Sequence, residues 1–373
     1  MQTKLATARG LWIVPVAVAA MTRLASGQET APAPAPGTAT RLQYSGFVDG
    51  YFAYNFNRPE DHENWFAGVG TSANRDNELA LNLAQVDLFM APSPVGFHVA
   101  FGAGTGLDVV HLAEEETWRH VVQASIQYRT SPDSRLLIEA GIYPSHIGFE
   151  GLASKDNWNY TRSWLGEFSP YYQTGVKLAW RLGDFWSTQV HLLNGWQRIT
   201  DNNRGKSLGW QLARVSDRFT LSFNGIVGPE KPDNDQDLRA LFDTVAVWKV
   251  TPAWSLGMSV DVATEERDPT DRATWWGAFL SARRAAPGAR TAFALRAETY
   301  DDQDGAISGT AQTLREYTAT FEYRPAAPLI VKLEARYDRS DAAVFTSDSL
   351  DLSGAPLLEG EQLLLLVGAV VTF

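Results

Sequence analysis

Polar and apolar residues alternate along most of this chain. In the stretch 329–338 every second residue is apolar, and the residues between them are charged. The apolar set is Leu329, Val331, Leu333, Ala335 and Tyr337, and the charged set is Lys332, Glu334, Arg336 and Asp338. Side chains of a β-strand point alternately to opposite faces, so this pattern predicts a strand with one apolar and one charged face. The same alternation recurs at 122–128, 136–142, 176–181, 256–261 and 316–323, which predicts an all-β protein.

The connections between these stretches alternate between short and long. Short turns rich in Pro, Gly, Asp and Ser occur at 92–94, 131–134, 183–184, 216–218, 251–253, 286–288 and 325–328. Long polar connections occur at 57–78, 106–117, 144–170, 197–206, 229–238, 264–273, 301–313 and 340–361. The sequence therefore predicts about 16 antiparallel strands, an even number that places both chain ends on the side of the short turns.

The apolar faces must be covered either by a second layer of protein or by lipid. A soluble β-sandwich would have to find a second sheet for every strand of one very large domain. Lipid offers no hydrogen-bond partner for an open sheet edge, so in a membrane the strands must close into an up-and-down barrel. A barrel of about 16 strands leaves a water-filled lumen for the polar inward residues. Residues 240–250 and 362–373 are apolar on both faces, which predicts a packed patch in the lumen or a subunit contact.

Both ends of the chain agree with an envelope protein. Lys4 and Arg9 precede an apolar stretch at 11–21 and small residues at 25–27, which predicts a secretory signal peptide over 1–27. An Ala/Pro-rich linker over 28–40 and a transmembrane barrel over 41–373 are expected to follow. The final strand ends on Phe373 and resembles the closing strand of bacterial outer-membrane barrels. That resemblance implies that Phe373 is the signal read by the barrel-assembly machinery.

Composition narrows the function classes. The 373 residues include no Cys, which excludes disulfides and thiolate sites, and the formal net charge of -11 argues against a nucleic-acid ligand. The abundant aromatic residues, 13 Trp, 12 Tyr and 18 Phe, suit girdles at the two membrane interfaces.

No pattern of catalytic or metal-binding residues stands out. The six His are scattered and no Gly-Xaa-Ser-Xaa-Gly motif occurs, so we expect no enzyme, no metal and no cofactor. The Gly-rich segment 102–106 is expected to have no helix after it, which argues against a phosphate cradle. Acidic segments at 233–237 and 301–305 could hold Ca²⁺ but lack the full spacing, so solvated loops are the alternative.

Five segments resemble one known family. They are Tyr44-Ser-Gly-Phe-Val-Asp-Gly-Tyr51, Pro144-Ser-His-Ile-Gly-Phe-Glu150, Asn157-Trp-Asn-Tyr-Thr-Arg-Ser-Trp164, Ser169-Pro-Tyr-Tyr-Gln-Thr-Gly175 and Leu192-Leu-Asn-Gly-Trp196. Together they resemble the OmpL-like β-barrel porin family, also called β-barrel porin type 2. The resemblance implies a porin-like barrel in the bacterial outer membrane, and it indicates a fold and a location better than a substrate. The partners we expect are outer-membrane lipid and lipopolysaccharide, the barrel-assembly machinery and small hydrophilic solutes. General porins are often trimers, so a homotrimer is one arrangement to test.

The third long loop, 144–170, is the best candidate for a constriction, because the third outer loop of 16-stranded general porins folds into the lumen. Its charged and aromatic candidates are Lys155, Asp156, Trp158, Tyr160, Arg162, Trp164 and Glu167. The inward candidates on the wall are Glu139, Lys177, Arg181 and His191. Opposed charges across a narrow pore set a transverse field, and aromatic rings offer a stacking track for sugars. Alternatively, the loop stiffens the barrel or packs against a neighbouring subunit.

Four functions are compatible with the sequence. The favoured one is a passive diffusion channel for small hydrophilic solutes, and the second is a channel selective for saccharides. A barrel enzyme such as a lipid hydrolase would need an adjacent Ser and His. The nearest pair, His120 and Ser125, is predicted to lie on opposite faces. The fourth is a structural or adhesive barrel with a filled lumen.

Overall fold

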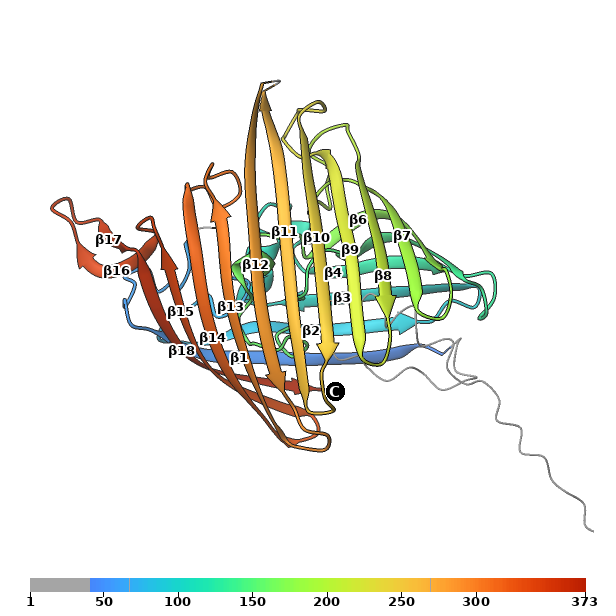
Figure 1. The fold of residues 1–373 in the computed structure, drawn as a ribbon, viewed down its shortest axis with the longest axis horizontal. Coiled ribbons are helices and arrows are strands. Elements are labelled where there is room, and N and C mark those ends of the chain that lie inside the picture. Colours follow the sequence, from blue (N-terminus) through green and yellow to red (C-terminus); the bar gives the residue numbers. More distant parts are fainter. Residues whose placement is uncertain (1–40, 67, 269) are drawn as a thin grey trace, which may run out of the picture.

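Sixteen antiparallel strands close into one barrel (Figure 1). The computed structural model describes residues 41–373 except 67 and 269, so the predicted signal peptide (1–27) and linker (28–40) lie outside the described residues. Among the described residues, no helix is long and apolar enough to cross a membrane.

The barrel strands follow one another in chain order around the wall. They are β1 (Gln43–Asn55), β2 (Leu79–Met90), β3 (Val95–Ala103), β4 (Val121–Tyr128), β5 (Leu136–Pro144), β6 (Tyr172–Arg181), β7 (Trp186–Leu193), β8 (Ser207–Val215), β9 (Phe219–Pro229), β10 (Leu238–Lys249), β11 (Trp254–Asp268), β12 (Asp271–Arg284), β13 (Thr291–Asp302), β14 (Gln312–Ala326), β15 (Leu329–Ser340) and β18 (Glu361–Thr372). The hairpin β16 (Phe345–Leu350) and β17 (Pro356–Glu359) forms a separate small sheet in the last outer loop.

The first and last strands close the barrel. The backbone N–H of Phe373 donates to the carbonyl of Gly46 at 2.9 Å, and the N–H of Gly46 donates to the carbonyl of Phe373 at 3.0 Å. β18 pairs with β1 on one side and with β15 on the other. Every barrel strand therefore has two neighbours, as a structure in lipid requires.

The two faces of the wall differ as the alternation predicts. On β18 the outward residues Leu365 and Val367 are exposed, whereas the inward residues Leu364 and Leu366 are buried. The inward residues of β10 are buried in the same way, in a cluster with loop side chains inside the barrel. The apolar inner faces of 240–250 and 362–373 thus belong to a packed patch in the lumen, the first of the two predicted explanations.

Two expectations about the outer loops are wrong. The predicted long loop at 264–273 is a β-hairpin, because β11 and β12 continue to pair through Glu265↔Ala273 and Glu266↔Arg272, an ion pair across the two strands. Glu266 and Arg272 carry polar outward side chains because they lie above the apolar band, and a polar strand end looks like a loop in the sequence. The Gly-rich segment 102–106 is followed by a helix after all, α2 (Thr105–Val110).

The glycines before α2 explain its position. Gly104 has a φ of 140°, and a Cβ on Gly106 would lie 2.4 Å from the carbonyl oxygen of Thr71. The absence of these two side chains lets α2 lie directly against the first outer loop and the wall, as small residues permit.

Candidate channel constriction

The loop between β5 and β6, residues 145–171, enters the lumen and reaches the opposite wall. In strand order, β13 to β15 lie about halfway around the barrel from β5 and β6. Side chains of β13 and β15 nevertheless bind the backbone of the loop, as described next. The loop therefore crosses the barrel at mid-height rather than lying along one side.

Carboxylates on that opposite wall accept hydrogen bonds from the backbone of the loop. Glu334 on β15 accepts from the N–H groups of Tyr160 at 2.5 Å and Thr161 at 2.9 Å. Glu298 on β13 accepts from the N–H groups of Trp164 and Leu165, both at 2.7 Å. The second pair of N–H groups begins the helix α3 (Trp164–Glu167), whose free N–H groups favour an anion.

Cations on the same wall bind the carbonyl groups of the loop. Lys332 donates to the carbonyls of Ser154 at 2.8 Å and Asn157 at 2.6 Å. Arg296 donates to the carbonyl of Thr161 at 2.9 Å, and Arg336 to that of Arg162. These buried donors and acceptors of the loop backbone are thus satisfied by protein groups, as buried polar groups require.

Ion pairs lock these wall residues in place. Arg296 lies between Glu150 of the loop at 2.5 Å and Glu316 of β14 at 2.9 Å. Arg336 pairs with Asp338 at 2.9 Å, and Asp338 also accepts from the indole N–H of Trp164 at 2.9 Å. Most of these side chains are at most 3% exposed, so the network is shielded from solvent screening.

Aromatic side chains of the loop pack where the wall carries glycine. A Cβ on Gly257 of β11 would lie 2.8 Å from the ring of Phe149, and one on Gly368 of β18 would lie 2.2 Å from that of Tyr160. Trp158 stands edge-on to Phe149, with ring centroids 5.3 Å apart. The bare backbone of the inner wall thus gives the loop space to approach closely.

The structure brings most of the loop candidates into this packed region. Trp158, Tyr160, Arg162 and Trp164 are buried, and the hydroxyl of Tyr160 donates to Asp49 of β1 at 2.8 Å. Glu167 accepts from the N–H groups of Gly70 and Thr71, which ties the third outer loop to the first. Burial raises the pKa of Glu167, against the effect of these hydrogen bonds.

Lys155 and Asp156 differ from the other loop candidates. They form an ion pair at 2.7 Å and keep 21% and 18% of their side-chain surface exposed. Lys155 also lies over the ring of Phe47 on the turn-side half of β1, 5.2 Å from its centroid. This charged pair of the loop is therefore partly accessible to solvent.

The wall candidates fall into separate groups. Glu139 and Lys177 form a buried ion pair at 2.5 Å on β5 and β6. The ring of His191 stacks on that of His146 in the loop, with centroids 4.2 Å apart, so this wall candidate contacts the loop directly. Arg181 lies at the turn end of β6, where it donates to the carbonyl of Asp133 at 3.5 Å, away from the loop.

His146 was not among the predicted site residues. Its Nδ1 lies 2.8 Å from Gln173 and its Nε2 lies 3.0 Å from the carbonyl of Gly225. Burial lowers the pKa of His146, with Lys177 adding to the effect. These two contacts anchor the loop root to β6 and β9.

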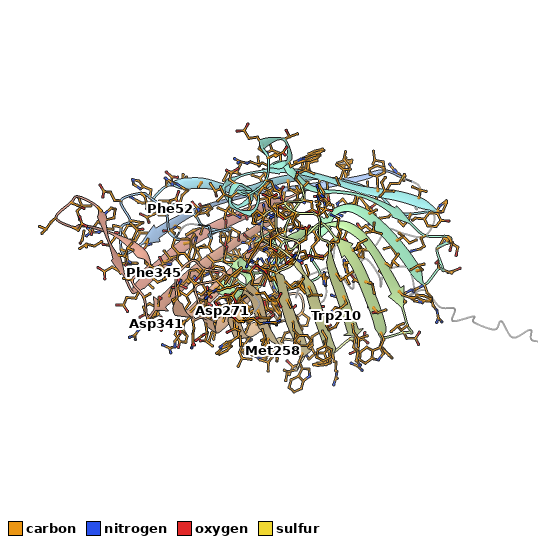
Figure 2. All side chains as sticks on the ribbon, turned by 90° about the horizontal axis from the view of Figure 1, so that it is seen from above. Phe52, Trp210, Met258, Asp271, Asp341 and Phe345 are labelled. Atoms are coloured by element: carbon orange, nitrogen blue, oxygen red, sulfur yellow. The ribbon has the colours of Figure 1, made fainter. Side chains whose placement is uncertain are left out.

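The prediction that polar inward residues face water is wrong at mid-height. Glu316, Lys332 and Arg336 are at most 1% exposed. The loop 145–171 fills the part of the lumen that was predicted to hold water. Figure 2 shows side chains crowded between the walls. Partly accessible inward groups remain toward the turn side, including the pair Asp87 and His98.

Sequence reasoning also missed the wall acceptors Asp49, Glu298 and Glu334 as site residues, and Glu150 within the loop. The alternation of polar and apolar residues does predict that Asp49, Glu298 and Glu334 face the lumen. Nothing in the sequence indicates that a loop rooted on distant strands would donate hydrogen bonds to them.

The serine and histidine considered for a hydrolase have other partners in the structure. His120 bonds to the carbonyl of Gly102, whereas Ser125 donates to Glu139, so the pair considered for a hydrolase is not formed. Across 41–373, leaving aside 67 and 269, no group of three or more His, Cys, Asp or Glu could hold a metal ion. In the two acidic segments considered for Ca²⁺, these carboxylates have protein partners. Asp302 accepts from backbone N–H groups of 306–308, and Asp237 pairs with Lys231.

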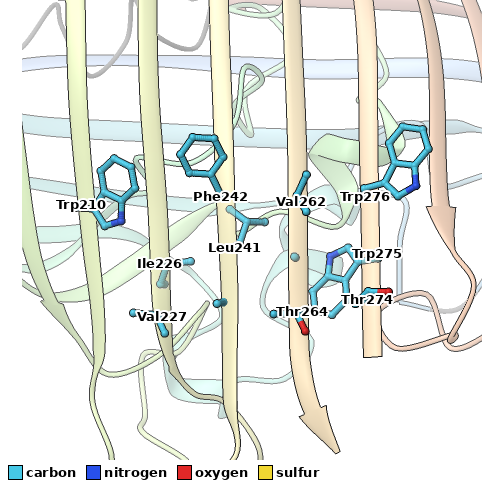
Figure 3. Close-up of a pocket in the computed structure, with 12 residues that line it drawn as sticks. Trp210, Ile226, Val227, Leu241, Phe242, Val262, Thr264, Thr274, Trp275 and Trp276 are labelled. Atoms are coloured by element: carbon cyan, nitrogen blue, oxygen red, sulfur yellow. The ribbon is translucent and has the colours of Figure 1, made fainter. Parts of the chain in front are cut away.

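A hollow on the outer face of β8 to β12 is apolar (Figure 3). Trp210, Phe242, Val262 and Trp276 line it and are among the exposed large hydrophobic side chains. Such an apolar hollow on the lipid side suits acyl chains.

Comparisons with known proteins agree with this architecture. The model of the family described as "Putative beta-barrel porin-2, OmpL-like" matches residues 41–373. The search of curated proteins found no match.

Similar solved structures include an anion-selective porin from Comamonas acidovorans, which is 10% identical, with a TM-score of 0.57 and coverage of 89% of this chain and 99% of the other. OmpF of Salmonella typhi in complex with daunomycin is 16% identical, with a TM-score of 0.58 and coverage of 91% and 99%. In-vitro folded OmpT of Vibrio cholerae in a trimer form is 10% identical, with a TM-score of 0.57 and coverage of 89% and 99%. At these identities the likeness concerns the fold alone.

Proposed function

The chain belongs to the OmpL-like β-barrel porin family of the bacterial outer membrane, and on that premise we propose that it is a narrow passive channel for small hydrophilic solutes. The observation that carries the proposal is the loop 145–171, which crosses a 16-stranded barrel and is held at its far wall by Glu298 and Glu334. A crossing loop of this kind sets the size limit of the lumen.

The charges beside the loop support small polar cargo. The ion pair of Lys155 and Asp156 remains partly exposed, and Asp87 with His98 offers a second polar pair on the wall. Opposed charges at a narrow point favour hydrated solutes and oppose apolar ones. The buried loop aromatics are engaged in packing, so the geometry supports a general channel better than a stacking track for saccharides.

A filled structural barrel is the second candidate. The burial of Glu316, Lys332 and Arg336 favours it, because open porin lumens keep such side chains in water. The two candidates differ in one measurable property, the ionic current through the folded protein.

Single-channel recording of the refolded chain 28–373 in a planar bilayer tests the proposal. We expect small, defined current steps, and larger steps after deletion of 152–168, which removes most of the crossing segment. As a control, deletion of 352–354 shortens the exposed turn between β16 and β17, outside the lumen, and should leave the steps unchanged. Protein that is folded by heat-modifiable gel mobility but carries no current would support the filled barrel instead.

We also propose that the chain forms a homotrimer through the face of β3 to β8. These strands have only 8 to 10 residues, whereas β11 and β14 have 15. A transmembrane strand needs about 9–11 residues to cross the apolar layer, so this side spans it barely or not at all. A neighbouring copy would cover the short side without exposing polar groups to lipid.

A further inference from the structure

Two arginines lie directly opposite one another on the outer surface of the barrel, near the outer ends of β14 and β15. Arg315 is the cross-strand partner of Arg339, and both side chains are exposed. They face away from the lumen, because the adjacent residues Glu316 and Asp338 are buried inside it and side chains alternate along a strand. Like charges directly opposite one another in a sheet repel, so strand pairing alone disfavours this arginine pair.

Aromatic residues next to the arginine pair fix its depth in the membrane. Tyr317 and Tyr337 are also cross-strand partners and lie on the same outward face, nearer to the middle of the barrel. Beyond them on this face come the exposed apolar side chains of Phe321 and Leu333. Tyrosines mark the interface between the apolar layer and the lipid headgroups. The arginine pair lies about 7 Å farther along the strands, toward the long outer loops, and is therefore at the level of the outer headgroups.

The carboxylates near the arginine pair are engaged by other groups. Glu361 of β18 is the other cross-strand neighbour of Arg339, but it accepts from the hydroxyl of Tyr337 at 2.6 Å. Asp301 and Asp341 accept from the hydroxyl and the backbone N–H of one threonine of β14, at 3.2 and 2.7 Å. Across 41–373, apart from 67 and 269, neither arginine side chain forms a hydrogen bond or an ion pair. Both guanidinium groups are thus available to an anion outside the chain.

We propose that Arg315 and Arg339 bind a phosphate group of lipid A, the part of lipopolysaccharide that lies in the outer leaflet. A planar guanidinium binds two phosphate oxygens at once, and the charges strengthen these bonds. A phosphate between the two guanidinium groups also removes their repulsion. The acyl chains of the same lipid then cover the apolar face beyond the tyrosines, so headgroup and chains are bound together. In strand order β14 and β15 are separate from β3 to β8, so the site faces lipid in the proposed trimer as well as in a monomer.

Native mass spectrometry of the detergent-folded chain 28–373 with lipid A tests this site, with dephosphorylated lipid A measured in parallel. We expect the loss of the phosphates to weaken binding at least tenfold, and Arg315→Gln and Arg339→Gln each to weaken binding of the phosphorylated lipid about fivefold. Arg272→Gln removes an exposed outer-side arginine that already pairs with Glu266, and it should change the affinity less than twofold. This control separates the site from the general charge of the outer surface.

Inorganic phosphate distinguishes a lipid ligand from a free anion. Because lipid A adds the contacts of its acyl chains, we expect an equal concentration of inorganic phosphate to leave it bound. Displacement of lipid A would overturn the lipid ligand and assign the site to free phosphate. Equal binding by wild type, Arg315→Gln and Arg339→Gln would overturn the site, as would an equal loss in Arg272→Gln.

The comparison of the two lipids on the wild type needs no variant to fold, and heat-modifiable gel mobility shows that each variant has folded. Equal binding of lipid A with and without its phosphates would by itself overturn the site. Since the measurement involves no current, its failure leaves the proposed channel untouched.

Discussion

At the scale of single residues, carboxylates of the wall act as acceptors for a loop backbone. Glu334 binds two consecutive N–H groups of the loop and also the hydroxyls of Thr161 and Thr320, at 2.5 and 2.6 Å. Four donors converge on one side chain, which only an ionised carboxylate can accept fully. Glu334 is thus a latch residue that holds the loop across the lumen.

Removing the negative charge of this latch should loosen the loop. Glu334→Gln keeps the shape but turns one acceptor into an NH₂ group that faces donors. We expect the free energy of unfolding in urea to fall by about 1.5–3 kcal/mol, the cost of losing hydrogen bonds to a buried charge. The exposed Glu359 supplies the control Glu359→Gln, which should change stability by less than about 0.5 kcal/mol. Equal stability of the two variants would contradict the latch.

At the scale of elements, the sequence predicts the strands better than the loops. Alternation identifies β15 because its lipid face and its lumen face differ in polarity along the whole strand. It fails at the outer ends of β11 and β12, because both faces are polar there once the strands leave the membrane. The place of 145–171 depends on contacts with β13 to β15, far away in sequence, which no local pattern encodes. The sequence predicts Tyr160 as a constriction candidate because it lies in the third long loop. It does not predict that Asp49 is the partner of Tyr160.

The inner face of β18 carries a glycine where the loop 145–171 packs against it. Gly368 leaves room for the ring of Tyr160, and its neighbour Ala369 points to lipid. Gly368→Val should push the ring away and weaken its bond to Asp49. We expect a loss of about 1–3 kcal/mol in unfolding free energy, as in overpacked cores, and faster protease cleavage within 145–171.

The adjacent position provides the control for this prediction. Ala369→Val adds the same side chain on the opposite face, where lipid yields to it, so stability and cleavage should stay near those of the wild type. If Gly368→Val left both properties unchanged, the close packing of loop and wall would not constrain the loop.

At the scale of the whole molecule, the barrel is taller on one side than on the other. Figure 1 shows β11 and β12 rising above their neighbours at the outer end. The wall from β3 to β8 is built from strands of 8 to 10 residues, yet its outward side chains are apolar, including Ile126 with 64% exposure. A short apolar face is poorly matched to the bilayer, and burial against another copy removes the mismatch.

Single cysteines can locate the contact face, because the chain has none of its own. Ile126→Cys lies on the short face and Leu280→Cys on the tall face of β12, where Leu280 is 69% exposed. With a short bis-maleimide in outer membranes, we expect linked species from Ile126→Cys and single chains from Leu280→Cys. Both positions are equally accessible to lipid in a monomer, so unequal linking can only come from a specific neighbour. Equal yields would contradict assembly through β3 to β8, and the short strands would then have to be matched by local thinning of the bilayer.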